Sequence, residues 1–126
     1  MNPTVFIDKE KNNAEIKIVK YGLKNEHIRI FLEIIAKFDD VEKVALFGSR
    51  AMGNHKKTSD VDIAVFGKNV NTGLACAIKF EIEEETVIPY FFDVVAYPVI
   101  KNEKLKEHID TKGIILWEKT KEVKNV

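Results

Sequence analysis

Two short stretches decide the fold: LFGSRAMG at residues 46–53 and SDVDIAV at residues 59–65. Each contains an apolar run typical of a strand. The first run ends abruptly at Gly48-Ser49, and the second begins at Asp60-Val61-Asp62. Reduced to its polar residues, the pattern is Gly-Ser, ten residues, and then Asp-x-Asp. It predicts two strands that carry the polar residues at their ends.

The pair Asp60 and Asp62 is the first candidate for chemistry. Residues two apart on a strand share a face, so their Cα atoms are expected roughly 6–7 Å apart. Like charges this close repel, and a divalent cation relieves the repulsion. Carboxylate oxygens select Mg²⁺ or Mn²⁺ rather than zinc. Taken alone, the pair also fits a solvated strand edge with two exposed aspartates.

The Gly48-Ser49 turn is the second candidate. Glycine lets backbone N–H groups approach a ligand closely, and a short helix that opens at Ser49 would favour an anion such as phosphate. The Ser49 hydroxyl can donate to a phosphate oxygen, and Arg50 adds a charge whose direction the sequence does not reveal. The alternative is a plain strand-to-helix turn, with Ser49 as a cap.

A third carboxylate, Asp93, lies in the apolar run FFDVV at residues 91–95. An unpaired charge buried in a central strand costs several kcal/mol, and a metal partner would explain its presence. The alternative is an edge strand on which Asp93 meets solvent or a nearby lysine.

Alternating periodic segments predict a small α+β fold, a mixed β-sheet with helices packed on one face. We expect helices over residues 25–38, around Leu74-Ile78-Ile82 and around Leu105-Ile109. Strands are expected at Lys43–Phe47, Asp60–Phe66, Phe91–Ala96 and Ile114–Trp117. Residues 1–22 form an extension, with strands at Val5–Ile7 and near Ile16-Ile18 or a frayed terminus. Residues 23–120 form the domain, and residues 121–126 form a tail.

Composition limits the classes of function. Lys+Arg and Asp+Glu both number 20 in the 126 residues, so the zero net charge disfavours nucleic-acid capture by a basic surface. No apolar run is long enough to cross a bilayer. The single cysteine, Cys76, cannot form an internal disulfide, and this favours a reducing cytoplasm. Its side chain is expected in the core. His27 and His108 are interpreted as surface residues, and His55, Lys56 and Lys57 as a solvated loop.

Residues 46–66 together with Asp93 resemble the polymerase-β-like nucleotidyltransferase superfamily, and more closely the minimal nucleotidyltransferase antitoxins encoded beside HEPN-domain toxins. The resemblance implies that fold. It assigns nucleotide binding to Gly48, Ser49 and Arg50, and two Mg²⁺ ions to Asp60, Asp62 and Asp93. These carboxylates would also be catalytic, with ATP as substrate. Where members often have Arg-Ala-Arg-Gly, this chain has Arg-Ala-Met-Gly and lacks the phosphate contact that a second arginine could make.

The resemblance implies an enzyme that moves a nucleoside monophosphate, AMP from ATP, onto a hydroxyl of a protein acceptor. The expected acceptor is a tyrosine of a HEPN-type partner encoded by a neighbouring gene, with no membrane or direct nucleic-acid binding. One alternative is a non-catalytic module that neutralises a partner by covering it. Another is a small-molecule nucleotidyltransferase, which would need further structure or a dimer to hold its acceptor. The sequence leaves homo- or hetero-oligomer formation open.

Overall fold

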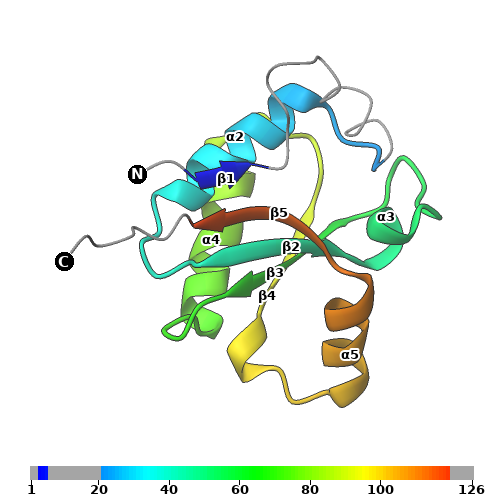
Figure 1. Cartoon of the computed structure of the whole chain (residues 1–126). Helices are drawn as coiled ribbons and strands as arrows, with labels where there is room; N and C mark the ends of the chain where they lie inside the picture. Colours follow the sequence, from blue (N-terminus) through cyan, green and yellow to red (C-terminus); the bar gives the residue numbers. More distant parts are fainter. Residues whose placement is uncertain (1–2, 6–20, 120–126) are drawn as a thin grey trace.

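The computed structural model describes residues 3–5 and 21–119. The strands are β1 (Pro3–Val5), β2 (Lys43–Phe47), β3 (Val61–Phe66), β4 (Phe92–Ala96) and β5 (Ile114–Lys119). The α-helices are α2 (Asn25–Ala36), α3 (Gly48–Met52), α4 (Thr72–Glu85) and α5 (Glu103–Lys112), and η1 (Tyr97–Val99) is a 3-10 turn. The strands form one sheet in the order β1-β5-β2-β3-β4 (Figure 1). Only the β3–β4 pair is parallel, so the sheet is mixed as predicted.

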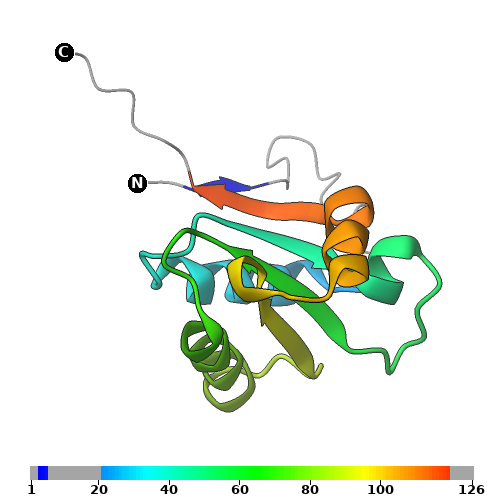
Figure 2. The ribbon, with the colours of Figure 1, turned by 90° about the horizontal axis from the view of Figure 1, so that it is seen from below.

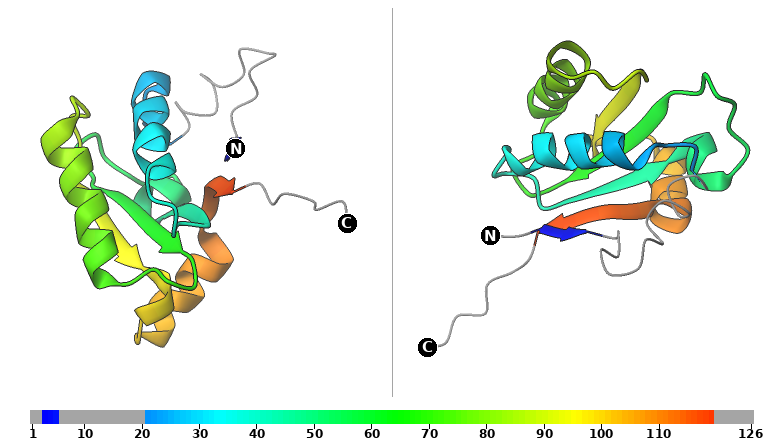
Figure 3. Two further views of the ribbon diagram at one scale, coloured as in Figure 1. Left: turned by 90° about the vertical axis from the view of Figure 1, so that its left-hand side faces the viewer. Right: turned by 90° about the horizontal axis from the view of Figure 1, so that it is seen from above.

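Helices α2 and α4 cover one face of the sheet and form the larger of its two core clusters. The apolar stripe of α2 packs with that of α4 and with one side-chain row of β2 and β3. The strand residues of this cluster alternate along the chain, as expected for a sheet face; they are Val44, Leu46, Val61, Ile63 and Val65. Asn71 starts α4 by accepting a hydrogen bond from the Leu74 N–H at 2.9 Å. Figure 3 shows α2 and α4 next to each other.

Helix α5 covers the opposite face of the sheet, which differs from the expected packing of all helices on one face. Ile109 of α5 packs with Phe47 and Ala64. These two strand residues alternate with the residues that face α2 and α4, so they point to the other side of the sheet. The helix lies beside α3 in Figure 2, and the two helices are in contact. This second layer exists because β2 and β3 are apolar on both faces. The α5 layer brings a helix to the turn that follows β2.

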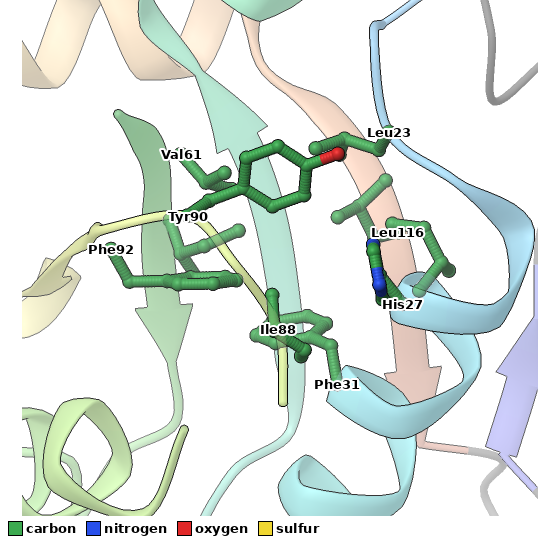
Figure 4. A pocket seen from close by; sticks show the side chains of 10 residues that line it. Leu23, His27, Phe31, Val61, Ile88, Tyr90, Phe92 and Leu116 are labelled. Carbon is green, nitrogen blue, oxygen red and sulfur yellow. The ribbon is translucent and has the colours of Figure 1, made fainter. Parts of the chain in front are cut away.

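An aromatic cluster fills the space between α2 and the β3–β4 pair (Figure 4). The rings of Phe31 and Phe92 stack at 5.6 Å, and His27 meets Tyr90 edge-on, also at 5.6 Å. The void among these side chains measures about 10 Å³, room for about one water molecule. It is therefore part of the core packing rather than a ligand site.

Both outer strands of the sheet have distinct surroundings. β1 pairs antiparallel with β5, slightly earlier than the expected Val5–Ile7, and the expected strand near Ile16-Ile18 lies outside the described residues. At the other edge, the Phe92 N–H of β4 donates to Glu83 and its carbonyl accepts from Lys79.

Within the described chain, no helix is long and apolar enough to cross a membrane.

Candidate active site

Two of the three candidate carboxylates lie side by side on neighbouring strands. Asp62 of β3 is paired in register with Asp93 of the parallel strand β4, and adjacent strands run about 4.8 Å apart. Asp60 comes immediately before β3, two residues from Asp62. The structure thus brings the sequence-predicted carboxylates to one edge of the sheet.

The charge environment of Asp62 includes both of the other carboxylates. Its pKa is raised from 3.8 to about 6, first by burial and then by the negative charges of Asp93 and Asp60. His108 and Arg50 act in the opposite direction. Among the described residues, none of the three carboxylates forms an ion pair. The solvated-edge alternative for Asp60 and Asp62 therefore fits Asp60 alone, because Asp62 is half-buried.

The three carboxylates are close without forming a ready-made metal cage. In residues 21–119, no three His, Cys, Asp or Glu side chains converge as metal ligands would. Burial, and after it the negative charges of Asp93 and Asp60, raises the Asp62 pKa, and a cation bound between the carboxylates would offset those charges. The prediction that Asp93 is buried was wrong: β4 is an edge strand, and Asp93 is exposed. Its exposure allows a ligand to reach it from solvent.

Gly48 begins α3 directly after β2, and the structure leaves no space there for a side chain. Its φ is +77°, and a Cβ atom added there would lie 2.1 Å from Oδ2 of Asp62. Glycine is thus required both by backbone conformation and by the approach of the carboxylate. Ser49, the next residue, is half-buried, and its hydroxyl makes no hydrogen bond within the described residues. The Gly-Ser turn therefore lies directly against Asp62 of the acidic pair.

His108 of α5 fixes this turn, a role that the sequence did not indicate. The Gly48 N–H donates to its Nε2 at 3.0 Å, and its ring meets Phe47 edge-on. The interpretation of His108 and His27 as surface residues was wrong. His108 is half-buried, and His27 is 9% exposed because it belongs to the aromatic cluster. Their charged neighbours in the sequence hide contacts that only the tertiary fold creates.

Arg50 is buried, with 1% of its surface exposed. All three guanidinium nitrogens donate to backbone carbonyls, those of Tyr21, Gly22, Lys57 and Ser59, at 2.9–3.2 Å. The guanidinium also lies 5.0 Å from the centre of the Tyr90 ring. Burial lowers the Arg50 pKa, which Tyr90, Asp60 and Asp62 oppose. These contacts tie the loop after α3 to the segment before α2, so Arg50 positions the site.

The loop between α3 and β3 borders a separate pocket of about 770 Å³. Lys56 and Lys57 are exposed as expected, whereas His55 is half-buried and lines this pocket together with Arg50 and Tyr90. The pocket does not include the three carboxylates.

Cys76 was predicted in the core but is exposed on α4, because it lies off the stripe of Ile78 and Ile82.

The fold and site define a nucleotidyltransferase: a Gly-Ser turn after one strand faces acidic residues on the next two. The model of the family "Polymerase beta, Nucleotidyltransferase" matches residues 30–122, and the chain belongs to this family. A protein of Methanocaldococcus jannaschii, described as a "putative protein adenylyltransferase", is 35% identical over 91 residues, which cover 68% of this chain and 95% of that protein.

Solved structures show the same fold. A toxin-antitoxin crystal structure with AMP-PNP superposes with a TM-score of 0.61 at 22% identity, over 75% of this chain and 73% of that one. A complex of tri-AMPylated Shewanella oneidensis HEPN toxin with its MNT antitoxin gives 0.56 at 17% identity, over 74% and 71% of the two chains. The expected polymerase-β-like fold is therefore confirmed.

Proposed function

We propose that this chain transfers AMP from ATP onto a hydroxyl group of a protein acceptor, a tyrosine of a HEPN-domain partner. The observation that carries the proposal is the register pairing of Asp62 with Asp93 beside the Gly48 turn. The name of the M. jannaschii relative supports protein adenylylation. The HEPN toxin in the S. oneidensis complex supports the choice of partner.

Two Mg²⁺ ions would supply the positive charge that this chemistry uses, and the three carboxylates are our candidates to hold them. Asp60, Asp62 and Asp93 would hold the ions, because carboxylate oxygens suit Mg²⁺ and a cation would offset the charges of Asp93 and Asp60, which add to burial in raising the Asp62 pKa. When bound, such ions polarise phosphate oxygens and neutralise charge that develops during transfer. The half-buried Ser49 hydroxyl would donate to a phosphate oxygen, with Gly48 leaving room for its approach. Arg50 would hold the turn in place from behind rather than contact the nucleotide.

The transfer itself is an in-line displacement. The acceptor oxygen forms a bond to the α-phosphorus, and the bond from phosphorus to the bridging oxygen of the β-phosphate breaks. Pyrophosphate leaves with that electron pair. The exposed Asp93 carboxylate is accessible to an incoming acceptor and would take the hydroxyl proton. We retain residues 23–120 as the proposed catalytic domain.

The test is label transfer to the HEPN-domain protein encoded by the neighbouring gene, with labelled ATP and Mg²⁺. Wild type should label the partner on a tyrosine, located by mass spectrometry. Asp60→Asn, Asp62→Asn and Asp93→Asn should each reduce the rate at least about 10²-fold. The matched control is Asp40→Asn, because Asp40 is exposed and lies outside the site; it should keep the wild-type rate.

Three other outcomes would contradict the proposal. Substantial transfer by both Asp60→Asn and Asp62→Asn would remove the assigned metal role. Partner binding without any label would point to a module that neutralises its partner by covering it. Labelling of small alcohols or sugars, but of no protein, would point to a small-molecule nucleotidyltransferase.

A further inference from the structure

A large apolar side chain, Phe91, is exposed at the edge of the carboxylate site. It immediately precedes β4, and its carbonyl accepts a hydrogen bond from the Val61 N–H at 2.9 Å. The β3–β4 register pairs Val61 with Phe92, so the next step outward sets Phe91 level with Asp60. Phe92 points into the core, whereas Phe91 and Asp93 are both exposed, as alternation along a strand requires. Phe91 is 73% exposed.

The chemistry of the proposed function, on which this inference rests, gives that position a meaning. The Gly48-Ser49 turn follows β2, and β3 lies between β2 and β4. Phosphates held at the turn place the leaving pyrophosphate on the β2 side of the carboxylates. An in-line attack comes from the side opposite the leaving group. The acceptor hydroxyl therefore approaches over β4, where Phe91 and Asp93 lie.

The charges around Phe91 define the chemistry of the approaching molecule. Asp60 and Asp93 flank it, and the C-terminal turn of α4 carries exposed Glu84 and Glu85. Glu83 links that helix end to β4, because it accepts from the Phe92 N–H at 2.9 Å. Val87, 77% exposed, lies in the connection between them. Phe91 is thus an exposed aromatic side chain with two carboxylates beside it, Asp60 and Asp93, which form its acidic rim.

We propose that Phe91 is the docking contact for a polypeptide acceptor. An aromatic or aliphatic side chain of the acceptor protein packs on the Phe91 ring, and lysines or arginines around it face the acidic rim. The nucleotide does not use this contact, since its phosphates lie on the β2 side. Phe91 then sets the affinity for the acceptor without taking part in bond making.

The test compares Phe91→Ala with Phe80→Ala, a matched control on α4 whose side chain is 61% exposed. Affinity for the HEPN-domain partner is measured by calorimetry without nucleotide, and KM values for partner and for ATP are measured separately. Phe91→Ala should weaken partner binding and raise the partner KM at least about tenfold, the effect of truncating an aromatic hot spot. The ATP KM should stay unchanged, Phe80→Ala should behave as wild type, and Phe91→Leu should recover part of the loss.

Equal effects of the two alanine variants would overturn the inference, as would a change confined to the ATP KM. Because both side chains are exposed, urea unfolding should give wild-type stability and exclude misfolding as a cause. The binding measurement needs no catalysis. If wild type transfers no label, the proposed function fails, while the calorimetric comparison still decides whether Phe91 is a docking contact.

Discussion

Replacing Asp62 by asparagine should stabilise the folded protein at neutral pH. The Asp62 pKa is raised from 3.8 to about 6 by burial and by the nearby charges of Asp93 and Asp60. A difference of that size corresponds to about 3 kcal/mol against ionised Asp62 in the folded state. Because the carboxyl group is partly solvated, screening reduces this to about 1.5 kcal/mol. Asp62→Asn should therefore raise the free energy of unfolding by about 1.5 kcal/mol and the Tm by about 6 °C.

The pH dependence gives this prediction its sharpest form. A carboxyl group whose folded pKa lies above its unfolded pKa binds more protons in the folded state between those values. The wild-type free energy of unfolding should thus fall as pH rises from about 4 to about 6, and remain reduced above that. In Asp62→Asn this decrease should disappear, so the two proteins converge near pH 4 and diverge at pH 7.5.

Urea unfolding at pH 4 and pH 7.5, without nucleotide or divalent cations, measures both quantities. Asp40→Asn is the control, since Asp40 is exposed and away from the site, and its effect should be near zero. If Asp62→Asn is no more stable than wild type at pH 7.5, or keeps the same pH slope, the carboxylates do not repel one another as argued.

Three further substitutions test the supports of the site. Gly48→Ala should lower the free energy of unfolding in urea by about 2–3 kcal/mol, because the added Cβ would meet Asp62. Gly53 has a φ of +82° but faces open space, so Gly53→Ala should lower it by only about 1 kcal/mol. Equal losses in the two variants would refute the clash. Arg50→Lys keeps the charge but loses the planar fork that reaches four carbonyls, so calorimetric melting should show a loss of about 2–4 kcal/mol; unchanged stability with weaker ATP binding would instead make Arg50 a nucleotide contact. His108→Leu removes the acceptor of the Gly48 N–H and should cost about 1 kcal/mol and raise the ATP KM several-fold; a wild-type KM would show that the turn needs no anchor.

Local patterns predicted the strands of the site well. The strand Lys43–Phe47 has the predicted bounds, and the strands of Asp62 and Asp93 begin one residue later than expected. These elements could be predicted because alternation and turn residues are properties of neighbouring positions. The same alternation correctly placed Val61 and Ile63 on the core face, opposite Asp62.

Contacts between distant segments could not be predicted from the sequence. The Arg50 guanidinium donates hydrogen bonds to carbonyls up to 29 residues away in the sequence. His108 accepts a hydrogen bond from Gly48, which lies 60 residues away. Nothing in the sequence around either residue says which segment will cover it. The same reason explains Asp93: an apolar run indicates a strand, but whether that strand is central or at an edge depends on the order of the whole sheet.

The side chains of Lys79 and Glu83 cover the outward backbone groups of Phe92 on the edge strand β4. An open strand edge is a template on which another copy can extend the sheet, and charged residues there oppose such growth. The pair also forms a salt bridge at 2.9 Å. Removing Glu83 would uncover the Phe92 amide, and removing Lys79 would uncover its carbonyl. Concentrated solutions of a Lys79→Ala, Glu83→Ala double variant should thus gain fibrillar or polymeric material that the unaltered chain resists.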